Sequence, residues 1–339
     1  MRINKIILQK ALEIVKPGLA TKELIEQATS FAFIKGRIVT YNDEISISHP
    51  VEGLEIEGAV KADKLYSLLS KIKTDEIEIE IKGNELILLS GRSKAGIPIQ
   101  MDIKLPLDEA IGSIGKWKDL PENFIKHMFF TMSACARDAS MPKFTCVNVS
   151  EEGFIEATDS FRIAHCKLRQ GMPIKTFLIP SSSVANMVKM NPNKIAEGNG
   201  WVHFKTAEGT IMSCRIFEDA FPDTSSVLDI TGDEIPLPKT ISEVLDRAEV
   251  FARREHMLDE IVEITLQDRK FKIRAESDAG WFEEEVNLKY SGTEIAFMIT
   301  PYLLKSILNE VSSCLFCNDK LKFQGEDWEY VVCLKNKTK

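Results

Sequence analysis

The arrangement of apolar and polar positions repeats three times along this chain. Residues 177–179 form a short apolar run, and residues 181–190 carry apolar positions spaced for one face of a helix. The same strand-then-helix pattern recurs in residues 59–72 and 297–308. The apolar runs end 119 and 120 positions apart (179−60 and 299−179), at Val60, Ile179 and Ile299. A nearly constant period over the whole length predicts tandem repeats of one structural unit.

Prolines and small polar residues mark where the helices are expected to start. Pro180 suits the start of the helix that follows the apolar run, and the serines after it suit its cap. A Leu-Pro pair at Leu120 recurs 117 positions later (237−120), at Leu237. After each pair, an Asn or Thr stands where an N-cap is needed and an apolar helical stripe follows. A further helix is predicted over residues 3–16, where Pro17-Gly18 ends it.

Most of the remaining pattern is that of antiparallel strands. Residues 76–81 alternate strictly between glutamate and isoleucine and turn at Gly83-Asn84, which predicts a half-exposed hairpin. A second hairpin is expected to turn at Lys35-Gly36. Residues 105–118 have no clear period and are interpreted as a linker. Further strands are expected at 45–56, 144–149, 154–158, 200–205, 210–216, 261–266, 271–275, 320–324 and 328–334.

These elements predict an α+β fold with three tandem domains, at residues 1–116, 117–234 and 235–339. In each domain, two amphipathic helices would cover one face of a mostly antiparallel sheet. Three such units in tandem leave open sheet edges at both ends of the chain. Because open edges invite aggregation, we expect a head-to-tail assembly that closes on itself and so removes them.

Composition and charge narrow the classes of protein. The chain is 44% hydrophobic and 28% charged, as in ordinary soluble globular proteins. No apolar run approaches the roughly 20 residues needed to span a bilayer, and the N-terminus has no signal-peptide block, so a cytoplasmic location without membrane attachment is expected. The net charge of −8 argues against a uniformly basic nucleic-acid binder but leaves room for a local basic patch.

The cysteines and histidines give little support to metal binding or catalysis. Seven cysteines, an odd number, favour reduced thiols, and the lone pair Cys314/Cys317 is interpreted as structural rather than as a zinc or redox site. Adjacent His165 and Cys166 could suggest a nucleophile, but neighbours in a strand point to opposite faces. No phosphate-binding loop, zinc-protease motif or serine nucleophile elbow is present. We therefore expect a protein that is not an enzyme and has no cofactor or metal.

Three segments resemble the bacterial sliding clamp, the beta subunit of DNA polymerase III. Residues 157–164, Ala-Thr-Asp-Ser-Phe-Arg-Ile-Ala, resemble the family's A-T-D-G-H-R-L-A segment. Residues 221–228 resemble its F-P-D-Y-R-R-V-L segment, and residues 330–334 resemble its Y-V-V-M-P close. The glutamates at 283–285 also resemble the family's third domain. The likeness extends over essentially the full chain.

The resemblance implies a ring that two three-domain subunits form head to tail. Such a ring encircles double-stranded DNA without reading its sequence, with helices lining the hole and sheets forming the outer wall. It tethers the replicative DNA polymerase, and the polymerase and the clamp loader bind it through short hydrophobic peptides in a pocket between the second and third domains. The expected function is therefore that of a DNA polymerase processivity factor. The alternative is a peptide-binding repeat scaffold that does not encircle DNA.

A sliding protein should present dispersed positive charge to phosphates without tight contacts to bases. Most of the basic residues expected to face DNA lie on polar faces of the predicted helices, whereas Lys22 and Arg137 lie near the segments that correspond to DNA-contacting loops in the family. Together they are Lys5, Lys10, Lys22, Lys64, Lys71, Lys126, Arg137, Lys189, Arg247, Arg253 and Lys305.

The partner-peptide pocket is transferred from the family only where its motifs match. The expected pocket residues are Thr158, Phe161, Arg162, Ile163, Pro222, Ser226, Val227, Val331, Val332, Cys333 and Leu334. A core role is the alternative for Ile163, Val227 and Val331. The family's Gly, His and Arg are replaced here by Ser160, Phe161 and Ser226, which suits a divergent or phage-encoded member with an altered peptide preference.

Overall fold

The computed structural model describes residues 1–308 and 311–335. The chain divides into two compact units, which are treated separately below. Unit 1 comprises residues 1–125 and 172–218, and unit 2 comprises residues 126–171 and 219–339. The expected middle domain, 117–234, is thus shared between the two units. No helix among the described residues is both long and apolar enough to cross a membrane.

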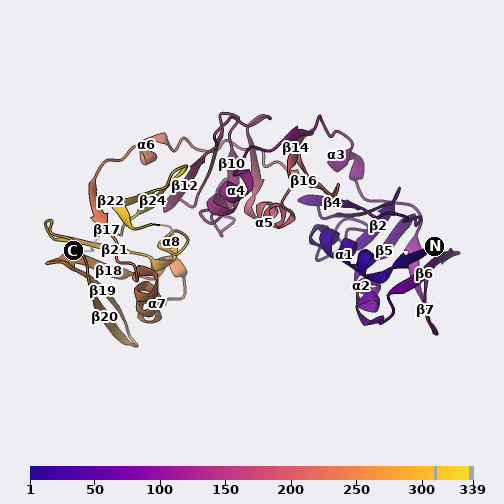
Figure 1. Cartoon of the computed structure of the whole chain (residues 1–339), viewed down its shortest axis with the longest axis horizontal. Helices are drawn as coiled ribbons and strands as arrows, with labels where there is room; N and C mark the ends of the chain where they lie inside the picture. The colour runs from indigo at the N-terminus through magenta and orange to yellow at the C-terminus, as the bar shows by residue number, and fades with distance from the viewer. Residues whose placement is uncertain (309–310, 336–339) are drawn as a thin grey trace. The chain divides into compact units, whose positions relative to one another are not determined.

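Unit 1 contains one long antiparallel sheet (Figure 1). In spatial order its strands are β1 (Arg2–Asn4), β6 (Glu76–Lys82), β7 (Glu85–Ser90), β8 (Ser93–Gln100), β5 (Gly58–Lys61), β2 (Ser30–Ile34), β3 (Arg37–Tyr41), β4 (Ile45–Pro50), β16 (Ile211–Arg215), β15 (Trp201–Lys205), β14 (Lys194–Glu197) and β9 (Lys118–Asp119). β13 (Phe177–Pro180) also belongs to this unit. The hairpins predicted around Lys35-Gly36 and Gly83-Asn84 are confirmed, as β2–β3 and β6–β7.

The helices of unit 1 follow the predicted apolar stripes. α1 (Lys5–Val15) buries Leu8 and Leu12 and begins at Asn4, whose Oδ1 accepts from the amide of Ile6 at 2.9 Å. α2 (Ala62–Lys71) contacts α1. η1 (Lys16–Gly18), α3 (Leu107–Ile111) and α5 (Ser181–Met190) complete the unit, except for the first residues of α4.

Three expectations for unit 1 are wrong. The strands expected over residues 45–56 stop at Pro50, where β4 ends, and residues 51–57 contain no strand. Residues 105–118 are not a bare linker: they contain α3, and Leu105, Leu107 and Ala110 are buried in a cluster with Tyr41 and Trp201. The serines do not cap α5, since Pro180 stands at its N-cap and no side chain makes a capping bond there. The hydroxyls of Ser182 and Ser183 donate instead to the carboxylate of Glu44.

Unit 2 contains two antiparallel sheet regions. In the first, β10 (Cys146–Val149), β11 (Phe154–Thr158), β12 (Arg162–Lys167), β24 (Trp328–Cys333), β23 (Lys320–Gln324), β22 (Ser313–Cys317) and β17 (Asp233–Pro236) are successive neighbours. In the second, the order is β20 (Gly280–Asn287), β19 (Lys270–Ser277), β18 (Val262–Gln267) and β21 (Ile295–Ile299). β12 pairs with β24, so strands far apart in the sequence form one surface.

The helices of unit 2 are α4 (Phe124–Met132), which begins in unit 1, α6 (Ser225–Leu228), α7 (Ile241–Ala252) and α8 (Pro301–Leu304), with 3-10 turns η2 (Pro142–Thr145) and η3 (Met257–Asp259). α7 packs against β19 and β20 (Figure 1). Thr240 stands at the N-cap of α7, as predicted, but its side chain makes no capping bond. The strand-then-helix pattern is confirmed in all three copies, although in the third α8 ends at Leu304. There the amide of Ile307 bonds to the carbonyl of Leu304, three residues back, which is tighter than an α-helical turn.

Candidate functional site

The turn between β11 and β12 is built by the side chains of its own polar residues. The Thr158 hydroxyl donates to the Arg162 carbonyl at 2.7 Å. One oxygen of Asp159 accepts from the amides of Phe161 and Arg162, each at 3.0 Å. Ser160 has φ +73°, in the left-handed region where glycine is favoured. The Thr-Asp pair therefore holds this turn, and Ser160 is the strained residue in it.

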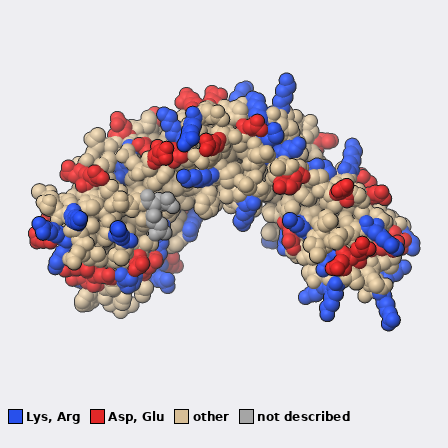
Figure 2. Space-filling view, in the orientation of Figure 1, with Lys and Arg blue, Asp and Glu red and all other residues tan. Residues whose placement is uncertain are grey.

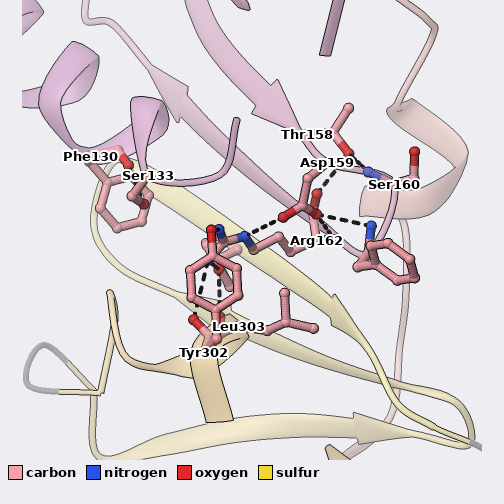
Figure 3. A network of polar contacts seen from close by, with 10 residues as sticks. Phe130, Ser133, Thr158, Asp159, Ser160, Arg162, Tyr302 and Leu303 are labelled. Atoms are coloured by element: carbon pink, nitrogen blue, oxygen red, sulfur yellow. Dashed lines mark hydrogen bonds and ion pairs between the residues drawn. The ribbon is translucent and has the colours of Figure 1, made fainter. Parts of the chain in front are cut away.

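Arg162 lies at the centre of a buried polar network (Figure 3). Its side chain is 1% exposed, and its Nε donates to Asp159 Oδ2 at 2.9 Å. Nη1 donates to the hydroxyl of Tyr330 at 3.2 Å, and Nη2 donates to the hydroxyl of Tyr302 at 2.6 Å. The Tyr330 hydroxyl then donates to the Leu303 carbonyl at 2.6 Å. These bonds fasten the β11–β12 turn to β24 and α8, so Arg162 positions the site rather than offering free donors to a ligand.

Asp159 is the anionic partner in this network. Burial raises the pKa of its carboxyl, and the neighbouring guanidinium of Arg162 acts in the opposite direction. The pair is nearly enclosed, with Asp159 9% exposed at its side chain. A buried ion pair of this kind depends on both members, since either charge alone would be left without compensation.

The three sequence segments predicted to meet do meet in unit 2. Antiparallel pairing places Ile163 of β12 opposite Val331 of β24. Both residues belong to a buried cluster with Leu228, and Val227 and Ile230 pack against it. The amide of Cys333 donates to the Phe161 carbonyl at 2.8 Å, which joins the C-terminal strand to the turn.

The segment before α6 is held to the same sheet. The Thr224 hydroxyl donates at 2.6 Å to Glu156, which lies on β11. The amine of Lys322 donates to the Leu228 carbonyl at 2.7 Å. Val227 is therefore fixed at the border of the cluster. Val227 and Pro222 are half-buried, while Ser226 is exposed.

Burial separates the predicted pocket residues into two groups. Val331 and Val332 are 1% and 0% exposed, so they belong to the core beneath the surface. Thr158 and Ile163 are also buried. The residues with accessible surface are Phe161, Pro222, Ser226, Val227, Cys333 and Leu334. Burial raises the pKa of the Cys333 thiol, so this cysteine contributes as an apolar group.

A groove with a volume of about 620 Å³ opens beside Phe161. Much of its apolar lining was missed in the sequence, because it comes from irregular segments and from α8: Met141, Phe144, Met257, Leu258 and Tyr302. Met141, Phe161 and Met257 are 55%, 38% and 42% exposed, which is unusual for large apolar side chains. η2 and η3 are too short to carry a periodic signal that would have revealed this surface.

Arg137 lines this groove. Its guanidinium carbon lies 4.7 Å from the centre of the Tyr302 ring, and its Nη1 donates to the sulfur of Met257 at 3.8 Å. The sequence placed Arg137 among the DNA-facing residues. In the structure it flanks the apolar groove, beside the ring that also contacts Arg162.

The other basic residues differ in whether their charged groups are exposed to solvent or bonded to other groups of the protein. Lys10, Lys22, Lys64, Lys71, Lys126, Lys189 and Arg253 are exposed. Lys10 and Lys189, from α1 and α5, line a cavity of about 420 Å³ in unit 1. The Lys5 amine donates to the Ile72 carbonyl at 2.9 Å. Figure 2 shows basic side chains projecting from the region of α2, β6 and β7.

Arg247 and Lys305 are bound to carboxylates. Arg247 makes two bonds of 2.8 Å to Glu284, and the Lys305 amine contacts Asp246 at 2.9 Å and also Glu249. In Figure 2 basic and acidic side chains alternate over the region of β18–β20. The field that these two residues present to a phosphate is therefore weaker than that of the exposed lysines.

The alternative of a cysteine nucleophile is not supported by the geometry. Cys166 is 0% exposed, and burial raises the pKa of its thiol. His165 Nδ1 lies 3.3 Å from Glu156 Oε2, not against the thiol. Cys314 is buried as well, with a thiol pKa raised by burial. Within residues 1–308 and 311–335, no group of three His, Cys, Asp or Glu side chains could hold a metal ion.

No protein-family profile matches the sequence. No curated protein matches it either. Solved structures do match. The sliding clamp (DNA polymerase III subunit beta) of Pseudomonas aeruginosa, crystallised with griselimycin, has a TM-score of 0.85 at 16% identity, covering 99% of each chain. The DNA polymerase III beta chain of Streptococcus pneumoniae has a TM-score of 0.85 at 18% identity, again covering 99% of each chain.

The DNA polymerase III beta subunit of Thermotoga maritima has a TM-score of 0.82 at 18% identity, covering 99% of this chain and 98% of the other. These comparisons confirm the predicted fold class: the chain has the sliding-clamp fold, with mixed α+β structure and large antiparallel sheets.

Proposed function

We propose that this chain, which has the fold of the bacterial sliding clamps, is itself a DNA polymerase processivity factor. It acts as a non-catalytic ring that encircles duplex DNA and tethers a replicative polymerase. The polymerase and a clamp loader bind through extended peptides that occupy the groove of unit 2. The three-domain division at residues 1–116, 117–234 and 235–339 is part of this proposal.

The observation that carries the proposal is the meeting of three distant segments at one apolar surface. Ile163, Leu228 and Val331 form its base, and Val227 borders it. The neighbouring groove of about 620 Å³ adds exposed Phe and Met side chains. An extended peptide with Leu or Phe anchors and a polar first residue suits such a surface, because apolar pockets take the anchors and the rim takes polar groups.

The ring requires a second copy of the chain. β20 lies at the end of the order of its sheet, so it has a strand neighbour on one side only among the described residues. Beside this edge, Trp281 of β20 and Val250 of α7 are each 61% exposed. An open edge flanked by exposed apolar side chains favours pairing with another chain. We infer a head-to-tail homodimer in which this edge meets unit 1 of the second copy.

The DNA-facing surface is assigned to the exposed helix-borne lysines. Lys10, Lys126 and Lys189 lie on α1, α4 and α5, with no salt bridge to a carboxylate in the described part of the chain. Exposed ammonium groups contact phosphates without reading bases, as sliding requires. Lys5, Lys22, Lys64, Lys71 and Arg253 complete the proposed surface, with lesser roles for Arg137, Arg247 and Lys305.

The groove is tested by calorimetry with a synthetic peptide that has a polar first residue and Leu and Phe anchors. Val227→Asp places a carboxylate at the half-buried border of the cluster, and we expect the affinity to fall at least about tenfold, or 1.4 kcal/mol. Leu24→Asp, at a residue 91% exposed in unit 1, is the matched control and should bind as the wild type does.

Val331 is unsuitable for this test because it is 1% exposed and a carboxylate there would disrupt the core. Equal peptide affinity of the wild type and the Val227 variant would overturn the assignment of the peptide to the surface that the cluster and the neighbouring groove form. Peptide binding without retention on circular DNA would favour a peptide-binding repeat scaffold.

A further inference from the structure

Two methionines are unusually accessible in the groove of unit 2. Met141 is 55% exposed and Met257 is 42% exposed, and both line the same cavity with Phe144 and Phe161. By contrast, Met128, Met187 and Met212 are fully buried. A thioether is flexible and polarizable, so it contributes to an adaptable apolar surface. The same exposure leaves its sulfur open to oxidants.

Met257 also accepts a hydrogen bond from the guanidinium of Arg137, which lines the same groove. Arg137 Nη1 donates to the Met257 sulfur at 3.8 Å, while the guanidinium carbon lies 4.7 Å from the Tyr302 ring centre. A thioether sulfur is a weak acceptor. If the sulfur carried an oxygen, that oxygen would be a far stronger acceptor for the same guanidinium.

We propose that Met141 and Met257 form an oxidation-sensitive modification site that controls peptide occupancy of the groove. This inference rests on the proposed function. Hydrogen peroxide transfers one oxygen atom to the thioether sulfur, which gives methionine sulfoxide and water; the sulfur loses two electrons and the peroxide gains them. The step is reversible, because a thiol-dependent reductase returns the thioether, with two thiols yielding a disulfide and water.

Two consequences of oxidation act in the same direction. The sulfoxide is polar, so an apolar anchor loses favourable contacts with two walls of the groove. The sulfoxide oxygen of Met257 also accepts strongly from Arg137, which holds the guanidinium at the groove when a peptide arrives. The affinity for an apolar-anchored peptide should therefore fall while the fold stays intact, because both side chains are exposed rather than in the core.

The test uses the full-length chain and the peptide described above. The protein is treated with hydrogen peroxide, the oxidised methionines are mapped by mass spectrometry, and peptide affinity is measured by calorimetry. We expect Met141 and Met257 to be oxidised before Met128 and Met187, with a fall in affinity of at least about tenfold. Thioredoxin-coupled methionine sulfoxide reductases should restore it.

Variants separate the site from general oxidative damage. The double variant Met141→Leu, Met257→Leu changes the groove lining itself, so its peptide affinity is compared only with its own value before treatment, and peroxide should leave that value unchanged. Met101 is 51% exposed in unit 1, so Met101→Leu is the matched control and should give no protection. Unchanged affinity after complete oxidation of both residues, or equal loss in the double variant, overturns the inference alone. Failure of the untreated protein to bind the peptide overturns the proposed function and the inference with it.

Discussion

Arg162 and Tyr302 contact each other through hydrogen bonds and through a cation–π contact. Arg162 Nη2 donates to the Tyr302 hydroxyl at 2.6 Å, and the guanidinium carbon lies 4.4 Å from the centre of the same ring. The residues are 140 positions apart in the chain. Since Tyr302 also lines the groove, this contact connects the buried network to the surface on which a peptide is proposed to bind.

The first prediction concerns Arg162→Met, which keeps much of the side-chain volume and removes the charge. Asp159 would lose its buried ionic partner, so the free energy of unfolding should fall by about 3 kcal/mol. Denaturant unfolding at neutral pH measures this change. Arg253→Met, at an exposed arginine, is the control and should change stability by no more than about 0.5 kcal/mol. A loss in the Arg162 variant as small as in the control would contradict the network.

The pH dependence of that variant follows from Asp159. Burial raises the folded-state pKa of Asp159, and loss of Arg162 should raise it further. With a folded pKa above the unfolded value, the unfolded chain loses its proton first as pH rises, so stability falls with rising pH in that interval. The deficit of Arg162→Met should therefore be largest near neutral pH and shrink as the pH falls toward about 4, near the carboxyl's ordinary pKa.

The sequence predicted the regular elements because the spacing of apolar residues determines which face of a helix or strand is buried. The alternation of Ile77 and Ile79 with glutamates is enough to identify β6. Residues 105–118 gave no such signal, because only Leu105, Leu107 and Ala110 are buried there and tertiary packing against Trp201 decides their burial. No local pattern could have shown that packing.

The residues of the candidate site likewise fall into those that the sequence could predict and those that it could not. Ile163, Val227 and Val331 could be anticipated from the resemblance of short segments, and β12–β24 pairing brings two of them together. Met141 and Met257 could not, since they lie at short 3-10 turns with no apolar period. The partners of Arg247 and Lys305 were equally hidden, because an ion pair depends on side chains that only the fold brings within reach.

A second prediction concerns His203, which is fully buried on β15 and whose ring contacts the Ser213 hydroxyl at 2.8 Å. Burial lowers its pKa to about 4. Because the unfolded chain takes up this proton first as pH falls below about 6.5, the wild type should lose about 3 kcal/mol of stability between pH 6.5 and 4 from this residue.

His203→Gln should remove that contribution, so its stability should change less over the same interval, as measured by urea unfolding at several pH values. His256→Gln, at an exposed histidine, should leave the wild-type dependence unchanged. Parallel pH profiles for the wild type and the His203 variant would contradict the lowered pKa.

The third prediction concerns DNA. Lys10, Lys126 and Lys189 are exposed on three helices, so reversing all three to Glu should weaken retention on circular DNA. If each contacts one phosphate, the slope of log affinity against log salt should become shallower by about 3. Reversal of Lys35, Lys82 and Lys167, which are exposed on turns and strands, changes the net charge equally and is the control. Equal losses in both triple variants would show a general charge effect rather than a helix-lined surface.

The last prediction concerns assembly. Light scattering should give a mass about twice that of the 38.2 kDa chain, because an open edge at each end is satisfied when two copies close head to tail. Val250 is 61% exposed on α7, next to Phe251, which stacks on Phe282 of β20 at 6.2 Å between ring centres.

Val250→Asp would bury an unpaired carboxylate in the proposed interface, so it should give a folded monomer with unchanged circular dichroism and poor retention on circular DNA. Phe129→Asp, at a residue 63% exposed on α4, introduces the same charge on a different helix of unit 2 and should leave the dimer intact. A wild-type monomer at micromolar concentration, a stable trimer, or a Val250 variant that remains dimeric would each contradict pairing at this edge. If only the Val250 variant dissociates, and it also loses retention on circular DNA, then pairing at the open edge of β20 is needed for the ring to encircle DNA.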